Sequence, residues 1–342
     1  MSRRFLFPHI DIQTMHVLVT GGAGFIGGHL AEEFLEDSHD VTVLDDLQPF
    51  YAEGIKRHTL NIHREIANKR DCGYRFVEGD VRDSETVWEV VTEADVVVHQ
   101  AAQAGVRASV DSPRKVTDIN VDGTVNLLEA AKEANVDRVI LASSSSVYGK
   151  PQSLPYTEDH PTEPVSPYGV TKLAQEHMAR VYAELHRLPT VCLRYFTVYG
   201  PRMRPNMAIS NFVSRCLNGE PPIIYGDGQQ TRDFTYVGDV VDANRTLLTD
   251  GSADGEILNI GSSDNISIQE LAEVVRDEID PELEIEYEPA READAQHTHA
   301  SVAKARDAVG YEPSRSIMEG VSEFIEWYER NREWYEPLVQ AS

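Results

Sequence analysis

The stretch that decides the fold reads His16-Val-Leu-Val-Thr-Gly-Gly-Ala-Gly-Phe-Ile-Gly27. A strand-like run leads into glycines spaced Gly-x-x-Gly-x-x-Gly, and an amphipathic segment continues to Glu36. Without side chains, the backbone of such a turn can approach a pyrophosphate, whose charge meets the positive N-terminal end of the next helix. The residues expected to form this site are Gly21, Gly24, Phe25, Ile26 and Gly27. The stretch therefore predicts a dinucleotide-binding turn, and a purely structural tight turn is the alternative.

Outward from this turn, short β-branched runs alternate with amphipathic segments of helix length. The alternation predicts an α/β fold, a Rossmann-type doubly wound parallel sheet whose ligands bind at the carboxyl ends of the strands. The predicted strands are 16–20, 40–44, 74–77, 94–99, 138–143 and 189–196. The predicted helices are 25–36, 84–91, 113–134 and 168–186.

Prolines and glycines punctuate the chain after Gly200, which is typical of a smaller lobe made of short excursions. A helix near 234–248 and a buried strand near 256–261 are predicted to return to the first lobe. The smaller C-terminal substrate lobe is therefore expected to be discontinuous. The predicted division is an N-terminal extension at 1–14, a dinucleotide-binding lobe at 15–197 and 231–263, and a substrate lobe at 198–230 and 264–342.

The amino-acid composition argues against a membrane span and against two kinds of binding partner. The 342 residues are 41% hydrophobic and 26% charged, and they contain no apolar run of the ~18 residues that a membrane span needs. Acidic residues number 57 against 31 basic ones, which gives a formal charge of -26. Such a charge repels nucleic-acid phosphate and anionic membrane surfaces, so neither is expected as a partner.

Lysine is scarce, since it supplies seven of the 31 basic residues. A carboxylate-rich and lysine-poor surface suits concentrated salt, where screening shortens charge repulsion to ~3 Å at 1 M. We therefore expect a halophilic protein, and an ordinary acidic cytosolic protein is the alternative.

Neither the cysteines nor the histidines suggest a metal site. The three cysteines, which form no C-x-x-C pair, are Cys72, Cys192 and Cys216. Their odd number and wide spacing favour a reducing cytoplasm over a disulfide framework. His297 and His299 are two residues apart, which is not the one-face spacing of a helical zinc pair. The apolar run at 5–7 is too short for a signal peptide, so no export is expected.

A carboxylate ends the second predicted strand. Asp45 lies 18 residues beyond Gly27, where it can accept hydrogen bonds from an adenosine ribose. Asp45 and Asp46 together would repel a 2′-phosphate, which favours NAD over NADP.

Tyr168 and Lys172 form Tyr-x-x-x-Lys, a spacing that puts both side chains on one face of a helix. An ammonium beside a phenol favours the phenolate, and lowering a tyrosine pKa from ~10 to roughly 7 takes about 4 kcal/mol. A solvated helix face is the ordinary alternative for such a pair. Catalysis is favoured here because the preceding strand ends in serines, 143–146, at the edge where the nicotinamide is expected.

These motifs make the chain resemble the extended short-chain dehydrogenase/reductase family, specifically its NAD-dependent nucleotide-sugar epimerases and dehydratases. The resemblance runs from about His16 to Glu336 and rests on ordered motifs at 20–27, 79–81, 99–102, 120–124, 143–149, 166–172 and 194–201. It implies Ser144, Tyr168 and Lys172 as catalytic residues, with Ser145 as the fallback serine.

The resemblance also implies the ligand contacts. For NAD these are Gly21, Gly24, Phe25, Ile26, Gly27, Asp45, Asp46, Asp80, Val81, Gln100, Ala101, Ala102, Ser143, Tyr168, Lys172 and Phe196. For a UDP-sugar they are Arg107, Ser144, Ser145, Ser146, Tyr168, Thr197, Arg204, Asn211, Arg232 and Arg291. Two arginines, Arg232 and Arg291, would hold the diphosphate. Glu292 and Ala293 stand where the family frequently has Pro-Gly, which puts that loop's shape in question.

Two positions discriminate between reaction types. Family dehydratases carry Asp and Glu, and decarboxylases a Glu, where this chain has Ser145 and Ser146. Without a carboxyl proton shuttle, a redox-neutral 4-epimerisation through a 4-keto sugar is favoured. The alternatives are a nucleotide-sugar dehydratase or decarboxylase and a non-catalytic NAD-binding scaffold.

The sugar is expected to be UDP-glucuronate ahead of UDP-glucose. Family glucose 4-epimerases usually have Asn where this chain has Thr197, and 199–208 and 49–51 resemble the UDP-glucuronate 4-epimerases. Arg204 can offer a bidentate fork to the 5-carboxylate, although Arg202 or Arg204 could instead form a surface ion pair. The family resemblance further implies a homodimer formed through the helices at 113–134 and 168–186.

Overall fold

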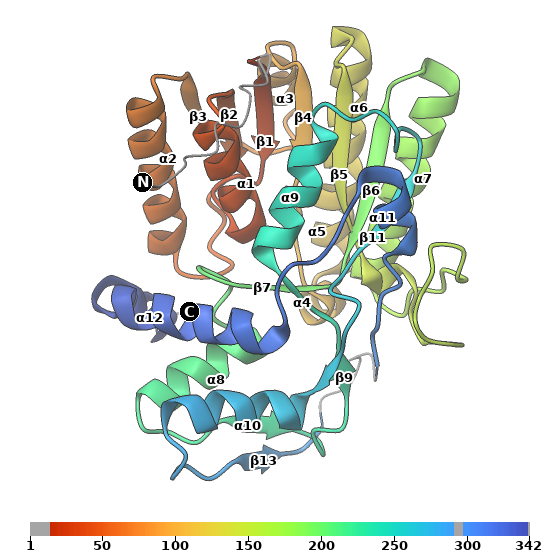
Figure 1. Ribbon diagram of the computed structural model, residues 1–342. Coiled ribbons are helices and arrows are strands. Elements are labelled where there is room, and N and C mark those ends of the chain that lie inside the picture. The colour runs from red at the N-terminus through yellow and green to blue at the C-terminus, as the bar shows by residue number, and fades with distance from the viewer. Residues whose placement is uncertain (1–13, 291–296, 341–342) are drawn as a thin grey trace, which may run out of the picture.

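The computed structural model describes residues 14–290 and 297–340, and a seven-stranded sheet in the order β11-β6-β5-β4-β1-β2-β3 lies at its centre (Figure 1). The strands are β1 (His16–Thr20), β2 (Asp40–Asp45), β3 (Tyr74–Glu78), β4 (Val96–His99), β5 (Arg138–Ser144), β6 (Thr190–Tyr195) and β11 (Ile257–Ile260). Every pairing in this sheet is parallel. The chain runs outward from β1 to β3 and then returns to build β4 on the other side of β1. This reversal confirms the doubly wound fold and puts a ligand crevice beside the carboxyl end of β1.

Helices cover both faces of the sheet. One core cluster packs α1 (Phe25–Glu36), α2 (Glu53–Arg70), α9 (Val237–Leu247) and α11 (Ala303–Val309) against one face. The other packs α3 (Ser84–Val91), α6 (Gly123–Ala134) and α7 (Pro167–His186) against the opposite face. Successive side chains of a strand point to opposite faces of the sheet, so β1 contributes to both clusters. Val17 and Val19 belong to the first cluster and Leu18 belongs to the second.

A third core lies beyond the carboxyl edge of the sheet, where α8 (Ala208–Leu217), α10 (Ile268–Ile279) and α12 (Ile317–Gln340) gather (Figure 1). Short strand pairs accompany these helices: β7 (Thr197–Tyr199) with β10 (Phe234–Tyr236), β8 (Ile223–Tyr225) with β13 (Glu286–Glu288), and β9 (Thr231–Arg232) with β12 (Ile266–Ser267). These elements come from the segments that the sequence assigned to a substrate lobe, together with 231–236. The lobe boundaries themselves stay a prediction.

The structure corrects two helix predictions and adds helices that were not predicted. Helix α2 was missed because Lys56, Thr59 and His63 occupy buried positions that normally carry apolar residues, which hides the periodicity. The predicted helix at 113–134 is α5 (Pro113–Thr117), a π-helical stretch (Asp118–Asp122) and α6. The helix predicted at 234–248 begins as β10 before α9. The short helix α4 (Val106–Asp111) and the long helix α12 were also not predicted.

Within the parts of the chain that the structure describes, no helix combines the length and apolar character needed to cross a bilayer. The same residues contain no cluster of three or more His, Cys, Asp or Glu side chains that could hold a metal ion. The three cysteines carry no disulfide bond.

Candidate active site

The glycine turn is too crowded for side chains. Gly21 has a φ of +69°, and a Cβ atom there would lie 2.8 Å from the amide nitrogen of Ala101. A Cβ atom on Gly27 would collide with the carbonyl oxygen of Gly21. Gly24 caps α1 without any side-chain hydrogen bond, so no side-chain oxygen takes the place of an anion at this helix end. The turn therefore has the shape and the positive helix end that a pyrophosphate requires.

Asp45 ends β2 beside this turn and is buried. Its carboxylate accepts hydrogen bonds from the amides of Ala23 and Leu47, at 3.1 and 2.9 Å. The Lys56 ammonium on α2 lies 3.1 Å from the same carboxylate. Lys56 was not predicted, because nothing in the local sequence shows that this lysine is buried beside Asp45. Asp46, in contrast, is exposed and accepts a local bond from the Gln48 amide.

The expected adenine contacts lie at the end of β3. Asp80 accepts hydrogen bonds from Arg82, whose guanidinium holds the pKa of Asp80 below its ordinary range. Val81 is buried against Gly123 at the start of α6. The structure thus places an apolar side chain and a fixed carboxylate together at the edge of the crevice.

The end of β4 continues the crevice toward β5. The Ala101 amide donates to the Thr20 hydroxyl at 3.2 Å, and the Gln100 side chain donates to the Tyr195 hydroxyl at 3.1 Å. These contacts hold the segment after β4 against the ends of β1 and β6. The other predicted cofactor residues of this region, Ala102 and Phe196, are half-buried and buried respectively.

The first turn of α7 packs directly on the serine run. Ser166 caps the helix by accepting a 3.1 Å hydrogen bond from the Gly169 amide. A Cβ atom on Gly169 would lie 2.5 Å from the carbonyl oxygen of Ser146, so this close approach requires glycine. The contact brings the Tyr168 hydroxyl into a hydrogen bond with Ser144. Of the two candidate serines, the structure therefore brings Ser144 to the tyrosine.

Lys172 lies one helical turn beyond Tyr168 and is buried. Its ammonium donates to the carbonyl oxygen of Ala142 at 2.7 Å and lies 5.9 Å from the centre of the Tyr168 ring. Burial lowers the pKa of Lys172 to about 8, while Cys192 and Glu176 act in the opposite direction. The structure therefore brings together all three predicted catalytic residues.

In the protein without NAD, the pKa of Tyr168 is not lowered. Burial raises the pKa of Tyr168 above its ordinary value, and the nearby Arg204 guanidinium and the Ser144 hydrogen bond oppose this rise without outweighing it. Desolvation disfavours the charged phenolate more than these groups favour it.

Behind the serines lies a buried ion pair that the sequence analysis missed. Glu176 accepts a 2.5 Å hydrogen bond from Ser143 and two 2.8 Å bonds from the Arg194 guanidinium on β6. Glu176 follows Tyr168 and Lys172 at the same four-residue spacing, so all three side chains share one face of α7. That spacing was the signal available in the sequence.

On the substrate side, Arg204 faces the catalytic candidates. Its guanidinium lies 5.4 Å from the centre of the Phe50 ring, and Tyr168 and Tyr51 act on its charge. Burial lowers the pKa of Arg204, and the two tyrosines oppose this shift. Phe50 and Tyr51 belong to the loop between β2 and α2, so Arg204 lies against the loop that follows β2 of the main sheet.

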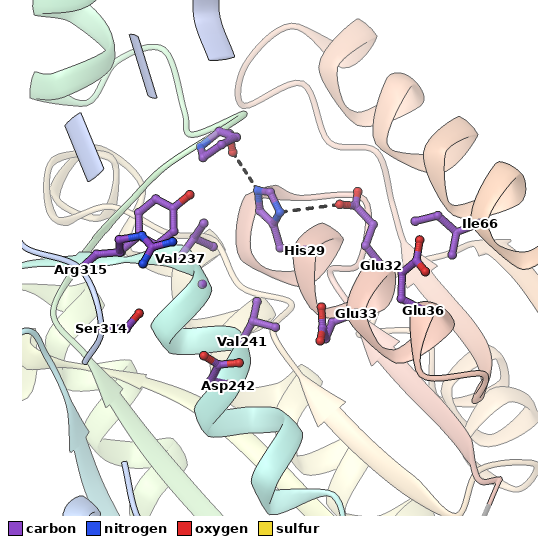
Figure 2. Close-up of a pocket in the computed structure, with 13 residues that line it drawn as sticks. His29, Glu32, Glu33, Glu36, Ile66, Val237, Val241, Asp242, Ser314 and Arg315 are labelled. Carbon is purple, nitrogen blue, oxygen red and sulfur yellow. Dashed lines mark hydrogen bonds and ion pairs between the residues drawn. The ribbon is translucent and has the colours of Figure 1, made fainter. Parts of the chain in front are cut away.

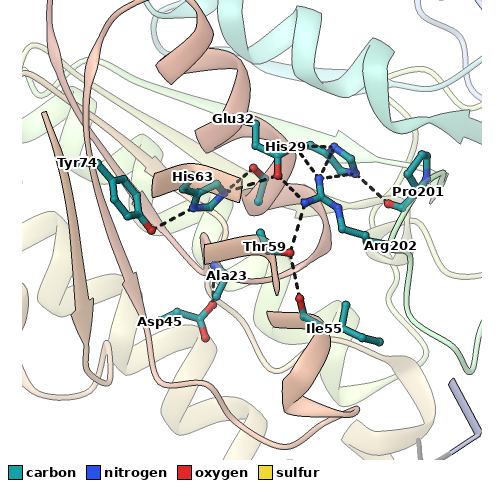
Figure 3. A network of polar contacts seen from close by, with 11 residues as sticks. Ala23, His29, Glu32, Asp45, Ile55, Thr59, His63, Tyr74, Pro201 and Arg202 are labelled. Carbon is teal, nitrogen blue, oxygen red and sulfur yellow. Dashed lines mark hydrogen bonds and ion pairs between the residues drawn. The ribbon is translucent and has the colours of Figure 1, made fainter. Parts of the chain in front are cut away.

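Arg202 forms an ion pair, as the alternative interpretation proposed, but the pair is buried rather than at the surface. Its guanidinium forms a fork with Glu32 on α1 and also contacts His29 (Figure 3). The two arginines of this loop thus have different surroundings, and of the two only Arg204 acts on the charge of Tyr168.

The remaining predicted substrate residues are dispersed. Thr197 begins β7 and is half-buried, and Arg232 in β9 donates to the carbonyl oxygen of Thr231 at 2.8 Å. Arg107 on α4 and Asn211 on α8 are exposed. Phe212, the neighbour of Asn211, belongs to the third core. Arg291 lies outside the described residues.

A separate pocket of about 440 Å³ lies between α1 and α9 (Figure 2). Its lining includes His29, the carboxylates of Glu32, Glu33 and Asp242, and the side chain of Arg315. None of the predicted site residues that the structure describes lines it. The candidate active site therefore rests on the strand ends and α7 rather than on this pocket.

The model of the NAD dependent epimerase/dehydratase family matches residues 17–261. The chain belongs to this family. A UDP-glucuronate 4-epimerase from Thermodesulfobacterium geofontis is 37% identical over 323 residues, which cover 93% of this chain and 97% of that protein. A UDP-glucuronic acid 4-epimerase from Bacillus cereus, solved with UDP-glucuronic acid and NAD, matches with a TM-score of 0.86 and 34% identity, covering 92% of this chain and 99% of that one. A UDP-glucose 4-epimerase from Thermotoga maritima, solved with UDP-glucose, matches with a TM-score of 0.84 and 31% identity, covering 93% of this chain and 100% of that one.

Membership in this NAD-dependent family identifies the chain as an enzyme of the epimerase type with NAD as its cofactor. The geometry fits that cofactor. The glycine turn leaves room for a pyrophosphate at the uncapped start of α1, and Asp45 is fixed beside the turn with its carboxylate held by neighbouring amides.

Proposed function

We propose that the enzyme is a UDP-sugar 4-epimerase that interconverts UDP-glucuronate and UDP-galacturonate. The observation that carries this proposal is the place of Arg204, a half-buried guanidinium beside Tyr168 and Phe50. A sugar carboxylate at the 5-position needs a cationic partner close to the reacting carbon, and a guanidinium can offer it two parallel hydrogen bonds. The UDP-glucuronate 4-epimerases among the relatives support the same substrate class.

The proposed mechanism assigns proton transfer to Tyr168. NAD, when bound, supplies a reversible hydride acceptor. The Tyr168 phenolate would take the proton of the sugar 4-hydroxyl and become the phenol, while the hydrogen bond with Ser144 holds and orients its oxygen. The buried Lys172 ammonium stabilises the phenolate form. Once the 4-keto sugar has rotated to present its other face to the cofactor, the Tyr168 phenol would return the proton to the 4-oxygen.

The residues proposed to hold the cofactor follow the edge of the sheet. Gly21, Gly24, Phe25, Ile26 and Gly27 receive the pyrophosphate; Asp45 and Asp46 serve the adenosine ribose; Asp80 and Val81 serve adenine; Gln100, Ala101, Ala102, Ser143, Lys172 and Phe196 serve the nicotinamide half. Because the reaction regenerates NAD in place, this set has to retain the cofactor rather than release it.

The proposed nucleotide-sugar contacts come mostly from the loops and short strands. Arg232 and Arg291 bind the diphosphate, Asn211 lies toward the uracil, and Arg107, Ser145, Ser146 and Thr197 surround the sugar with Arg204. Two guanidinium groups match the charge of a diphosphate.

Elimination of water is disfavoured because Ser145 and Ser146 stand beside Ser144 in the first turn after β5. A hydroxyl with an ordinary pKa is a poor proton shuttle compared with a carboxyl group. The second candidate function is a UDP-glucose 4-epimerase, which the Thermotoga maritima relative favours.

A panel of UDP-sugars, incubated with the purified enzyme in high potassium chloride and followed by mass spectrometry and NMR, tests the proposal. Epimerisation conserves mass, elimination loses water, and decarboxylation loses carbon dioxide. We expect UDP-galacturonate from UDP-glucuronate with no change in mass. Conversion of UDP-glucose alone would transfer the assignment to the second candidate, and no conversion of any UDP-sugar would leave the scaffold interpretation.

We further propose a homodimer formed through α7 and the helices at 113–134. Helix α7 exposes four apolar side chains at helical spacing, Val170, Met178, Val181 and Leu185. Light scattering on the wild type and on Leu185→Asp tests this surface, because a charge at its most exposed apolar residue should yield monomers. The three free cysteines support a reducing cytoplasm as the compartment.

A further inference from the structure

Three consecutive residues of the loop between β7 and α8 point to three different places. Arg202, which has a left-handed φ of 60°, reaches α1. Met203 is fully buried in the third core, and its carbonyl oxygen accepts a 3.0 Å hydrogen bond from Tyr335 on α12. Arg204 faces Tyr168 in the candidate active site. The two residues directly before Arg204 are therefore both anchored, which sets the position of Arg204.

The anchor at Arg202 is the tighter of the two. Its guanidinium donates to the two carboxylate oxygens of Glu32 at 2.5 and 2.7 Å, and to His29 Nδ1 at 3.0 Å (Figure 3). The residue is 5% exposed. A buried bidentate pair of this kind fixes both distance and orientation.

His29 completes the anchor in its neutral form. Burial lowers the pKa of His29 to about 4, with the Arg202 charge as the next cause. The neutral ring donates from Nε2 to the carbonyl oxygen of Pro201 at 2.8 Å and accepts from Arg202 at Nδ1. One histidine on α1 thus holds both the backbone and the side chain at the start of this loop.

The same network reaches the glycine turn. His63 on α2 bonds to the carbonyl oxygen of Gly28, in the first turns of α1, at 3.0 Å, and to the Tyr74 hydroxyl at 3.1 Å (Figure 3). Thr59, also on α2, lies 3.5 Å from the Arg202 guanidinium. The loop is therefore fastened both to α1, which begins at the glycine turn, and to α2.

We propose that Arg202 is a positioning residue for substrate recognition: its ion pair with Glu32 ties the loop to α1 and thereby places Arg204 against the sugar of the substrate. The inference rests on the proposed function in that Arg204 is assigned to the sugar. It does not depend on whether that sugar is a uronate.

A double-mutant cycle between Arg202→Ala and Arg204→Ala tests the inference, with whichever UDP-hexose the wild-type enzyme converts as the substrate. We expect Arg202→Ala to raise KM at least about tenfold while kcat stays within about threefold, and to change KM by less than about twofold in the Arg204→Ala background. A residue that acts through Arg204 loses its effect when Arg204 is gone, whereas a merely structural residue does not. NAD affinity, followed by fluorescence, should stay unchanged.

The matched control is Glu33→Gln, which removes the neighbouring charge on the same helix, a charge that pairs with the exposed Arg245 instead. Its KM should equal that of the wild type. Should Arg202→Ala not fold, Glu32→Gln replaces it in the cycle, because it keeps the volume and one hydrogen bond while removing the charge. Arg202→Lys should restore part of the KM, since it retains the charge but not the fork.

Additive changes of KM in the cycle, or a wild-type KM for Arg204→Ala, would overturn the inference. The proposed uronate specificity fails by a different result, a wild-type preference for UDP-glucose over UDP-glucuronate. In that case KM is measured with UDP-glucose throughout the double-mutant cycle, which still decides whether Arg202 acts through Arg204.

Discussion

The two halves of the candidate site are held in place by different means. On the cofactor side, Asp45 and Ser144 are the last residues of long parallel strands, and Lys172 donates to the backbone of β5. On the substrate side, Arg232 lies in a strand of two residues and Arg204 in a loop. Backbone ladders fix the first group, and individual side-chain anchors such as the one at Arg202 fix the second. Chemistry shared by many relatives can thus sit on a rigid sheet while substrate choice is set by loops.

The largest expected effect is on stability, and it comes from the buried ion pair between Glu176 and Arg194 on the cofactor side of the site. Glu176→Ala leaves the buried Arg194 guanidinium unpaired, which should lower the free energy of unfolding by about 3–5 kcal/mol. Urea unfolding measures this loss. The control is Arg75→Ala, which removes an exposed strand arginine paired with Glu89 and Glu93 and should cost less than about 1 kcal/mol. Equal costs would mean that the buried pair does not hold α7 on the sheet.

Removing the phenol should separate catalysis from binding. Tyr168→Phe is expected to lower activity by at least roughly 100-fold, the lower scale for a general acid or base, while NAD and UDP-sugar still bind. Lys172→Ala should in addition weaken the retention of NAD. Near-normal turnover of Tyr168→Phe would remove the tyrosine from its proposed role.

The substrate side of the site is tested by comparing kcat/KM for UDP-glucuronate with kcat/KM for UDP-glucose. Arg204→Ala should reduce kcat/KM for UDP-glucuronate at least about tenfold more than for UDP-glucose, because a charge-assisted hydrogen bond contributes about 1.5–3 kcal/mol. Parallel assays on the two UDP-sugars give the ratio. Equal losses on both would leave a 4-epimerase whose specificity comes from elsewhere.

The pH dependence of kcat/KM tests Lys172, which belongs to the cofactor side of the site. Burial lowers the pKa of Lys172 to about 8, so the ammonium of the folded enzyme loses its proton as the pH rises through that value. If the ammonium supports the phenolate, kcat/KM should fall toward about tenfold per pH unit above pH 8, since this parameter reports the free enzyme. A profile that stays flat to pH 9.5 would contradict the role.

The smallest effect is expected from salt. Screening within a chain of formal charge -26 should raise the melting temperature in molar potassium chloride, by roughly 2–4 °C for each kcal/mol of relieved repulsion. The gain should be greater around α10, where Glu270, Glu273, Asp277 and Glu278 line one shallow hollow, than within the sheet. Hydrogen exchange of α10 and β5 peptides, with and without salt, compares the two regions. A flat or falling melting temperature would retire the halophilic interpretation.

The sequence predicted the structure well where a regular repeat of residue types along the chain determines it. All seven strands of the main sheet were predicted within two residues of their observed bounds, because buried parallel strands are nearly continuous β-branched runs. Tyr168 and Lys172 were likewise paired correctly by the four-residue spacing of a helix.

It failed where side chains from distant segments decide the outcome. Helix α2 buries Lys56 and His63 because Asp45 and Gly28 supply their partners, and no local pattern reveals such partners. The choice between Arg202 and Arg204 stayed open for the same reason. Only the folded chain shows that Arg202 forms an ion pair with Glu32, 170 residues away in the sequence.

The path of the chain through the main sheet has a consequence for synthesis. Strand β11 forms one edge of that sheet, yet it follows β7, α8 and β8, which belong to the other half of the molecule. Its residues Leu258 and Ile260 are fully buried in the first core cluster. A growing chain therefore cannot finish the cofactor half and then add the substrate half, because the outermost strand emerges only after part of the second half has been made. The two halves have to mature together, and a nascent chain that stops near residue 200 leaves the backbone edge of β6 without its partner strand until β11 arrives.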